Sequence, residues 1–425
     1  MVLSFKRLLK EKDHLLFNGL VVYYWLVFSF INYAADPNDI NAYEGTGYRY
    51  YLLIIPLMFY ILLNIKVFLK LKFEKNIMWI ILYTVIVSAF SLSRMDLKTI
   101  MNASALALPL MIVATIRPAV NIKLINMLFL LSIVIVIILH QDGLSKYGYL
   151  PGQTTGNLHQ GLWWRISIWE HCTPPFSAAF AIIVIIANFF YNPRRSRYLF
   201  YMLGIYFIIF SGSRTALVII FISGIFLLVT RVVALKSCSL FKTFPVISLL
   251  LFYCMVIFPI IIAFVSIENE FLKSFVFRQA EGYEELQEQT VRPVMMYSQM
   301  KIFVDSYALG VGTDNLNNKY KSLTAGTSAE RTVGSDAFMT YLMARDGIAF
   351  IFLVFFFAGM FSEAMKRNDI IMYLMILIIM LYATSYGGFL NFMNPVFLML
   401  WGLLYSGCNR RIIGRGGAGS CRQST

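Results

Sequence analysis

The sequence predicts an all-α fold, a polytopic transmembrane helical bundle of about 12 helices with a large extramembrane loop that contains short helices. The first observation is composition: 59% of the 425 residues are hydrophobic, 14% are charged and the mean hydropathy is +0.70. A soluble domain is about a quarter charged, so this chain has too little polar surface for water. The second observation is that the apolar residues form runs long enough for membrane helices. The third is that basic residues gather in the short loops between those runs.

Twelve apolar runs are the expected spans, and an even number places both termini on one side. The large loop between the ninth and tenth spans covers 267–346, and a second extramembrane segment covers about 141–173. The three last spans lie within 347–408, and the tail 409–425 is rich in Gly and Ser and is expected to be disordered. The expected spans, all but three of them within 1–266, are 15–33, 50–67, 77–93, 99–116, 124–140, 174–191, 198–210, 215–230, 243–266, 347–365, 370–386 and 395–408.

The distribution of charge indicates the orientation. With both termini in the cytoplasm, the inner segments hold 22 of the 36 lysines and arginines but only five of the 22 acids. Cytoplasmic loops of membrane proteins carry this excess of basic residues. The net charge of +14 is therefore a topology signal, and we expect no nucleic-acid partner. The cysteines are scattered without metal-ligand spacing, so we expect no metal and no cofactor.

The first candidate site is Ser211-Gly212-Ser213-Arg214-Thr215, between two short apolar runs on the outer side. The run 198–210 would cover only about 20 Å of a hydrocarbon core of about 30 Å, so Arg214 is expected below the outer interface. Serines before a helix act as N-caps, and the helix N-terminus presents free amides. With Arg214 they would form an anion site suited to phosphate. The alternative is a capped helix whose arginine reaches lipid headgroups.

The large loop supplies the second group of candidates. Its Glu-rich start, its amphipathic run 294–304 and the turn Leu309-Gly310-Val311-Gly312 predict short helices lying on the membrane surface. Four arginines lie in it or at its exit, and for each a solvated surface charge is the simpler interpretation; they are Arg278, Arg292, Arg331 and Arg345. Asp336 and Asp346 flank the start of the next span, where an aspartate is often only an N-cap or a first-turn charge.

The third candidate is the aromatic segment 163–171 in the smaller outer segment. Arg165 and Glu170 lie five residues apart in it, just before a span. An aromatic belt with an ion pair and a sugar-stacking or catalytic role are equally good interpretations of this pattern.

In order and spacing, these segments resemble the O-antigen polymerase and O-antigen ligase superfamily of bacterial inner membranes. The segment 211–215 opening a span looks like that family's signature, and Arg292 followed by the amphipathic run and the turn 309–312 looks like its loop motif. The Arg165–Glu170 stretch is similar to polymerases of this type. The resemblance covers most of the chain in topology and about 165–350 in motif.

One departure separates the two branches of the family. Its ligases carry a histidine about eleven residues before a glycine at the start of the span after the loop. Here Asp336 holds that position before Gly347, which favours the polymerases.

The resemblance implies a polysaccharide polymerase, a glycosyltransferase that joins undecaprenyl-diphosphate-linked oligosaccharide repeat units at the periplasmic face into O-antigen or a similar surface polysaccharide. Arginines would stabilise the departing diphosphate, and a carboxylate would orient and deprotonate the attacking hydroxyl. The diphosphate is assigned to Arg214 and Arg292, with Arg278 and Arg165 as weaker candidates; Asp336 is the candidate base and Glu170 its rival.

Two other functions stay open, a ligase and a transporter, and they differ from the polymerase in the molecule on which they act. A ligase would transfer finished glycan to lipid A-core, and a protein of a different class, a lipid-linked saccharide transporter or flippase, also commonly has twelve helices. A transporter is expected to show repeat symmetry, and the sequence shows no repeat. Membrane lipids and a chain-length regulator are the further expected partners.

Overall fold

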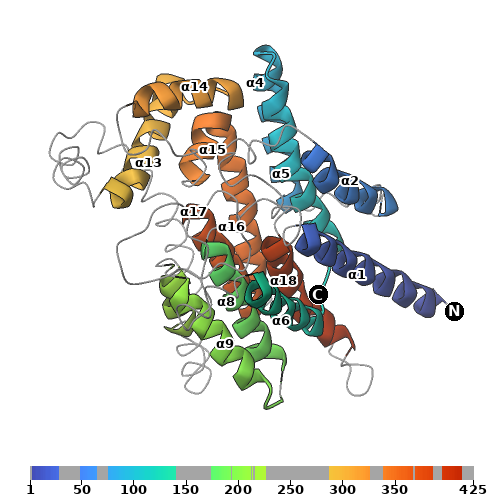
Figure 1. Ribbon diagram of the computed structural model, residues 1–425. Helices are drawn as coiled ribbons and strands as arrows, with labels where there is room; N and C mark the ends of the chain where they lie inside the picture. Colours follow the sequence, from blue (N-terminus) through green and yellow to red (C-terminus); the bar gives the residue numbers. More distant parts are fainter. Residues whose placement is uncertain are drawn as a thin grey trace.

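The computed structural model describes residues 2–27, 48–64, 75–139, 174–192, 194–211, 213, 216–225, 287–325, 338–366, 369–385 and 395–413. Within these residues all regular structure is helical, as predicted (Figure 1). The helices are α1 Val2–Leu26, α2 Tyr48–Leu63, α4 Lys75–Ser93, α5 Leu97–Ile116, α6 Ile122–Leu139, α8 Pro174–Tyr191, α9 Arg197–Phe210, α13 Gln287–Asp305, α14 Thr313–Thr324, α15 Phe338–Asp346, the 3₁₀ turn η6 Gly347–Ala349, α16 Phe350–Lys366, α17 Ile370–Ser385 and α18 Pro395–Ile413. A further short helix covers Ala216–Ile225.

Two described stretches, Asn76–Ser93 and Met339–Ala364, are long and apolar enough to cross a membrane. Seven further apolar helical stretches within the described part of the chain are shorter, with 10–17 residues each. The outward faces of the helices are hydrophobic: Phe59, Met202 and Phe221 are 62%, 72% and 67% exposed. A water-soluble surface rarely presents so many large apolar side chains together.

The helix bounds agree with the expected runs at α4, α5, α6, α8, α9 and α17, within two residues at each end. Bounds of the other helices differ by more; α2, for example, ends at Leu63 rather than at 67. α1 begins at Val2 because its first residues are mostly good helix formers, and α18 continues to Ile413, into the tail expected to be disordered from 409. The helical stretch expected to begin at 347 is preceded directly by α15, so the loop expected to end at 346 ends in a helix. The expected span 243–266 lies outside the described residues.

The helices pack as neighbours in a bundle. α4 lies against both α5 and α16, α16 against α17, α17 against α18, and α8 against α9 (Figure 1). Gly359 of α16 lies against the Asn76 side chain of α4, where a Cβ atom would collide with it. Between α6 and α8, Asn126 and Asn188 exchange amide hydrogen bonds of 3.1 and 2.7 Å in an otherwise apolar contact. Small residues and paired amides of this kind hold helices together where the surroundings are apolar.

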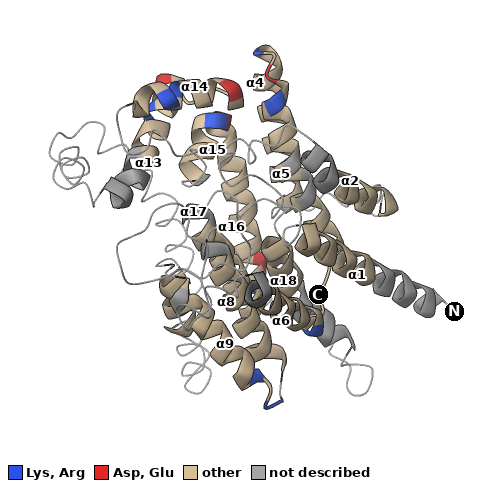
Figure 2. Ribbon diagram, viewed as in Figure 1, with Lys and Arg blue, Asp and Glu red and all other residues tan. Residues whose placement is uncertain are grey.

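The bundle has two distinct ends. At one, which we call the hairpin end, the turn between α4 and α5 lies beside the start of α14, and α4 contacts the turn η6 (Figure 1). At the other, Arg117 pairs with Glu363 at 3.1 Å, and His14 accepts a hydrogen bond of 3.1 Å from the Ala119 amide. Asp346 and Glu363 mark the two ends of the α16 segment, about 25 Å apart along its axis. Figure 2 shows charges of both signs on α14 and basic residues at the turn between α8 and α9.

Candidate functional site

The site is built on a break in a long apolar helix. Between α15 and α16 the chain passes through the 3₁₀ turn η6, and Gly347 takes the left-handed conformation, with φ of +65°. Such a break leaves backbone N–H and C=O groups without intrahelical partners. In an apolar bundle these groups need partners from elsewhere in the protein.

The turn of the large loop supplies those partners. Val311 donates its amide to the carbonyl of Ala344 at 2.9 Å and Gly312 to that of Arg345 at 3.0 Å, while the amide of Ile348 donates to Ala308 at 2.7 Å. The two segments therefore form one unit, although more than 30 residues separate them in the chain. The glycine turn predicted from the sequence is confirmed, and the structure gives its physical reason.

Gly310 and Gly347 are the residues at which the two backbones touch. A Cβ atom on Gly310 would collide with the amide nitrogen of Gly347, and one on Gly347 would collide with the backbone of Ala308 and Leu309. Gly310 also has a positive φ, +73°. Only glycine combines this conformation with this close approach.

We expect Gly347→Ala to separate the loop from the helix break. The methyl group meets rigid backbone rather than a flexible side chain, and the left-handed φ adds strain. The expected cost is about 2–4 kcal/mol of stability, seen as a lower melting temperature in detergent. Gly19→Ala is the matched control, since nothing lies within 4 Å of its added methyl. Equal melting temperatures for the two variants would contradict the proposed backbone contact.

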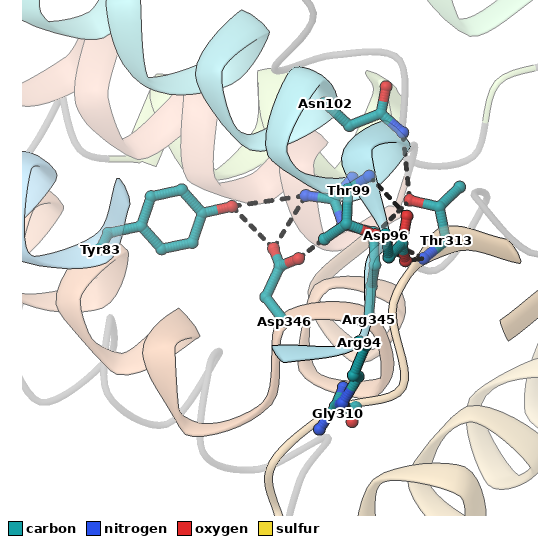
Figure 3. Close-up of polar contacts among 9 residues, drawn as sticks. All are labelled: Tyr83, Arg94, Asp96, Thr99, Asn102, Gly310, Thr313, Arg345 and Asp346. Carbon is teal, nitrogen blue, oxygen red and sulfur yellow. Dashed lines mark hydrogen bonds and ion pairs between the residues drawn. The ribbon is translucent and has the colours of Figure 1, made fainter. Parts of the chain in front are cut away.

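A buried ion pair lies at the break. Arg345 holds both carboxylate oxygens of Asp346, with Nε to Oδ1 at 2.6 Å and Nη2 to Oδ2 at 2.8 Å. Tyr83 of α4 donates its hydroxyl to Asp346 Oδ2 at 2.6 Å, so the network joins the break to the neighbouring helix (Figure 3). Arg345 and Asp346 are 6% and 3% exposed. The guanidinium also lies over the ring of Tyr341, 5.5 Å from its centroid.

Two interpretations from the sequence are wrong here. Arg345 is not a solvated surface charge, because it is buried against Asp346 and Tyr83. Asp346 does not cap the following turn with its side chain; its carboxylate is engaged by Arg345 and Tyr83 instead. A pair of buried, mutually bonded charges is the stable form of such groups in an apolar environment.

A second carboxylate, Asp96, joins the hairpin to the loop. Its Oδ1 accepts the Thr99 amide at 3.0 Å, which caps α5, and its Oδ2 accepts the Thr313 amide at 3.0 Å at the start of α14. The hydroxyls of Thr99 and Thr313 face each other at 2.9 Å, and Asn102 donates to Thr313 at 3.2 Å (Figure 3). Asp96 is 7% exposed. One carboxylate thus serves the N-termini of two helices that are distant in sequence.

Contacts at the edge of the hairpin reinforce this junction. Arg94 donates a short hydrogen bond from Nη1 to the carbonyl of Gly310. Lys98 forms a more exposed ion pair with Asp314 at 3.5 Å. Surface pairs of this kind contribute little by themselves, so the buried Asp96 contacts carry the attachment.

The three loop helices form one compact unit. A small apolar cluster holds them together, made by Met295, Ile302, Val311, Leu316, Tyr320 and Ala344. Between α13 and α15, Thr340 donates to Gln299 Oε1 at 2.5 Å. Gln299 lies six residues before the end of α13, and Thr340 six before the end of α15. Since both C-terminal ends meet the glycine turn, α13 and α15 run parallel, with their ends at the same level.

The structure describes only some of the candidate site residues predicted from the sequence. Arg292 belongs to α13, and only its backbone is described. Ser213 confirms the predicted cap of the helix that begins at Ala216, because its Oγ accepts the Ala216 amide at 3.3 Å. The other candidates, Arg214, Arg278, Arg165, Asp336 and Glu170, lie outside the described residues, as does Arg331.

Sequence reasoning missed Tyr83, Asp96, Thr99 and Thr313. An aspartate three residues before a threonine at the start of an apolar run is a local N-cap signal for α5, and could have identified Asp96. Nothing local indicates its second partner, which lies 217 residues away in the chain. In the described part of the chain, no three His, Cys, Asp or Glu side chains are grouped as metal ligands.

Comparison with known proteins adds no family to this description. No family model matches the chain, and no curated protein matches it.

Proposed function

We propose that the protein is a polymerase that joins undecaprenyl-diphosphate-linked oligosaccharide repeat units at the extracytoplasmic face of a bacterial inner membrane. The observation that carries the proposal is the parallel contact between α13 and α15 on the hairpin end of the bundle. It relates Arg292, the candidate diphosphate ligand in α13, to Asp336, the candidate base just before α15.

The positions of these two residues along the parallel axes of α13 and α15 support a shared site. Arg292 lies seven residues before Gln299, and α15 begins two residues before Thr340. The α13 backbone at Arg292 therefore extends about 7.5 Å past the level at which α15 begins. Asp336 is two residues before Phe338, a length of chain that spans up to about 7 Å. The connection before α15 is thus long enough to bring the carboxylate to the level of Arg292.

Three observations support a polytopic membrane protein with both termini in the cytoplasm. Two helices are long enough to span, and the outward faces of shorter ones are apolar. Arg117, Glu363 and His14, which the charge distribution assigns to the cytoplasmic side, meet at one end of the bundle. Asp96 and Thr313, assigned to the outer side, meet at the hairpin end. A bundle of twelve spans accommodates both groups of contacts.

The proposed reaction needs no metal. The donor glycan leaves its lipid diphosphate as a hydroxyl of the acceptor unit attacks the anomeric carbon. Arg214 and Arg292 stabilise the negative charge that develops on the diphosphate, with Arg278 and Arg165 as further candidates. Asp336 takes the proton of the attacking hydroxyl, with Glu170 as the alternative base.

Incubation of the purified protein with a lipid-linked repeat unit tests the function. A polymerase lengthens the glycan on the undecaprenyl carrier, with lipid A-core absent. Glycan transfer only after lipid A-core is added would instead identify a ligase. Movement of unaltered substrate across a vesicle membrane, without any lengthening, would identify a transporter.

The Asp336→Asn variant is expected to lower turnover about 10²–10⁴-fold, because the amide keeps the size of the carboxylate but takes up no proton. The initial rate of glycan lengthening at saturating substrate measures this. Glu170→Gln is the parallel variant. Normal turnover in Asp336→Asn combined with loss in Glu170→Gln would transfer the role of base to Glu170.

A further inference from the structure

Asp96 has a geometry that an ordinary helix cap does not require. A cap needs one carboxylate oxygen for the first turn of its own helix, and Oδ1 does this for α5 by accepting the Thr99 amide. The second oxygen accepts the Thr99 hydroxyl at 2.6 Å and, beyond its own helix, the Thr313 amide at the start of α14 at 3.0 Å. Gly312, with φ of +78°, lies so close to Oδ2 that a Cβ atom there would collide with it.

We propose that Asp96 is a positioning residue for glycan transfer, which holds α14 and, through it, the α13–α15 pair at the hairpin end of the bundle. This inference rests on the proposed function. α14 packs against α13 and α15 through Leu316 and Tyr320, so a displacement of its N-terminus shifts the helix that carries Arg292. Asp96 itself contacts helix termini and threonine hydroxyls and is not assigned to the substrate.

The Asp96→Asn variant separates the two duties of this side chain. The amide oxygen can still accept the Thr99 N–H and so cap α5. The NH₂ group then faces the Thr313 N–H, which places a donor against a donor and removes the carboxylate bond to α14, so that the Thr99 hydroxyl, 2.6 Å from the same N–H, is left as its acceptor. We expect amide hydrogen exchange in α14 to become about tenfold faster, and turnover at saturating substrate to fall by about tenfold or more.

Asp369→Asn is the matched control. Asp369 is also a buried cap: its Oδ1 accepts the amides of Ile371 and Met372 at 3.2 and 3.1 Å, at the start of α17. It lies close to Lys366, at the end of α16 opposite the hairpin. If Asp96 acted only through general stability, both variants would show the same loss of melting temperature and of activity. If Asp96 positions α14, glycan transfer is slower and the α14 amides exchange faster in Asp96→Asn, and neither change occurs in Asp369→Asn.

A cross-link provides a rescue test. The hydroxyls of Thr99 and Thr313 are 2.9 Å apart, so cysteines at these positions are placed for a disulfide. In Asp96→Asn/Thr99→Cys/Thr313→Cys, with the five natural cysteines replaced by serine, oxidation should restore turnover and α14 protection, and dithiothreitol should remove both. The parent protein for comparison is the cysteine-free chain.

The outcomes are distinct. Wild-type α14 exchange and turnover in Asp96→Asn would overturn the proposal, and so would a fully cross-linked triple variant that stays inactive. If the wild-type protein fails to lengthen lipid-linked glycan, the proposed function fails and the positioning role with it. Faster α14 exchange in Asp96→Asn would then still show that Asp96 holds the start of α14.

Discussion

Replacing Asp346 with alanine is expected to destabilise the protein by about 3–5 kcal/mol, the largest effect on stability of any single change considered. The substitution leaves the Arg345 guanidinium buried without a counter-charge and removes the acceptor of the Tyr83 hydroxyl. The measurement is thermal unfolding in detergent, followed by tryptophan fluorescence, together with the yield of monodisperse protein.

Two further variants show whether the charge is the cause. Tyr83→Phe removes the hydroxyl's hydrogen bonds to Asp346 and Arg345 but leaves the ion pair intact, and should cost only about 1–2 kcal/mol. Arg345→Met/Asp346→Leu replaces the whole pair with apolar side chains and should be more stable than Asp346→Ala, because no uncompensated charge stays buried. A double variant as unstable as the single one would contradict this explanation and place the cost in packing alone.

Replacing Arg214 with alanine is expected to abolish polymer and to leave single repeat units on the lipid carrier. The loss of one stabilising donor at a developing charge lowers the rate about 10²–10³-fold. The described neighbours favour this position: Ser211 and Ser213 are buried, and Ser213 caps the helix at Ala216. The partial positive charge of that helix start and the Arg214 guanidinium would therefore act on the same anion. The measurement is the initial rate with purified protein.

Arg194→Ala is the control for Arg214→Ala. Arg194 is an exposed arginine at the turn between α8 and α9, so its removal should change the rate by less than about twofold. A polymer ladder of wild-type length in Arg214→Ala would remove Arg214 from the mechanism. Equal loss in the two variants would indicate a general effect of charge at the membrane surface.

Much of the fold could be predicted because its signals are local. The apolar runs predict the first and last residues of α4, α8 and α9 to within two positions. The serine before Ala216 identified a helix cap, and the glycines at 310 and 312 identified a turn. Each of these features depends on residues a few positions apart, which is the range over which propensity and capping act.

The arrangement of the candidate site could not be predicted because its contacts are long-range. Tyr83 meets Asp346 across 263 positions, and Asp96 meets Thr313 across 217. A charged residue entering a span looks the same in sequence whether it faces solvent or a buried partner. The sequence therefore favours a solvated Arg345, although its partner is the next residue in the chain.

Labelling of single cysteines tests the account most directly, because Arg214 and the loop helices can share a substrate only on one side of the membrane. Arg214→Cys and Asp314→Cys, each in a cysteine-free chain, are treated with a membrane-impermeant maleimide in intact spheroplasts, with Arg194→Cys as the cytoplasmic reference. We predict that positions 214 and 314 react in intact spheroplasts and that position 194 reacts only after permeabilisation. Reaction of 214 and 314 from opposite sides would contradict the proposed site.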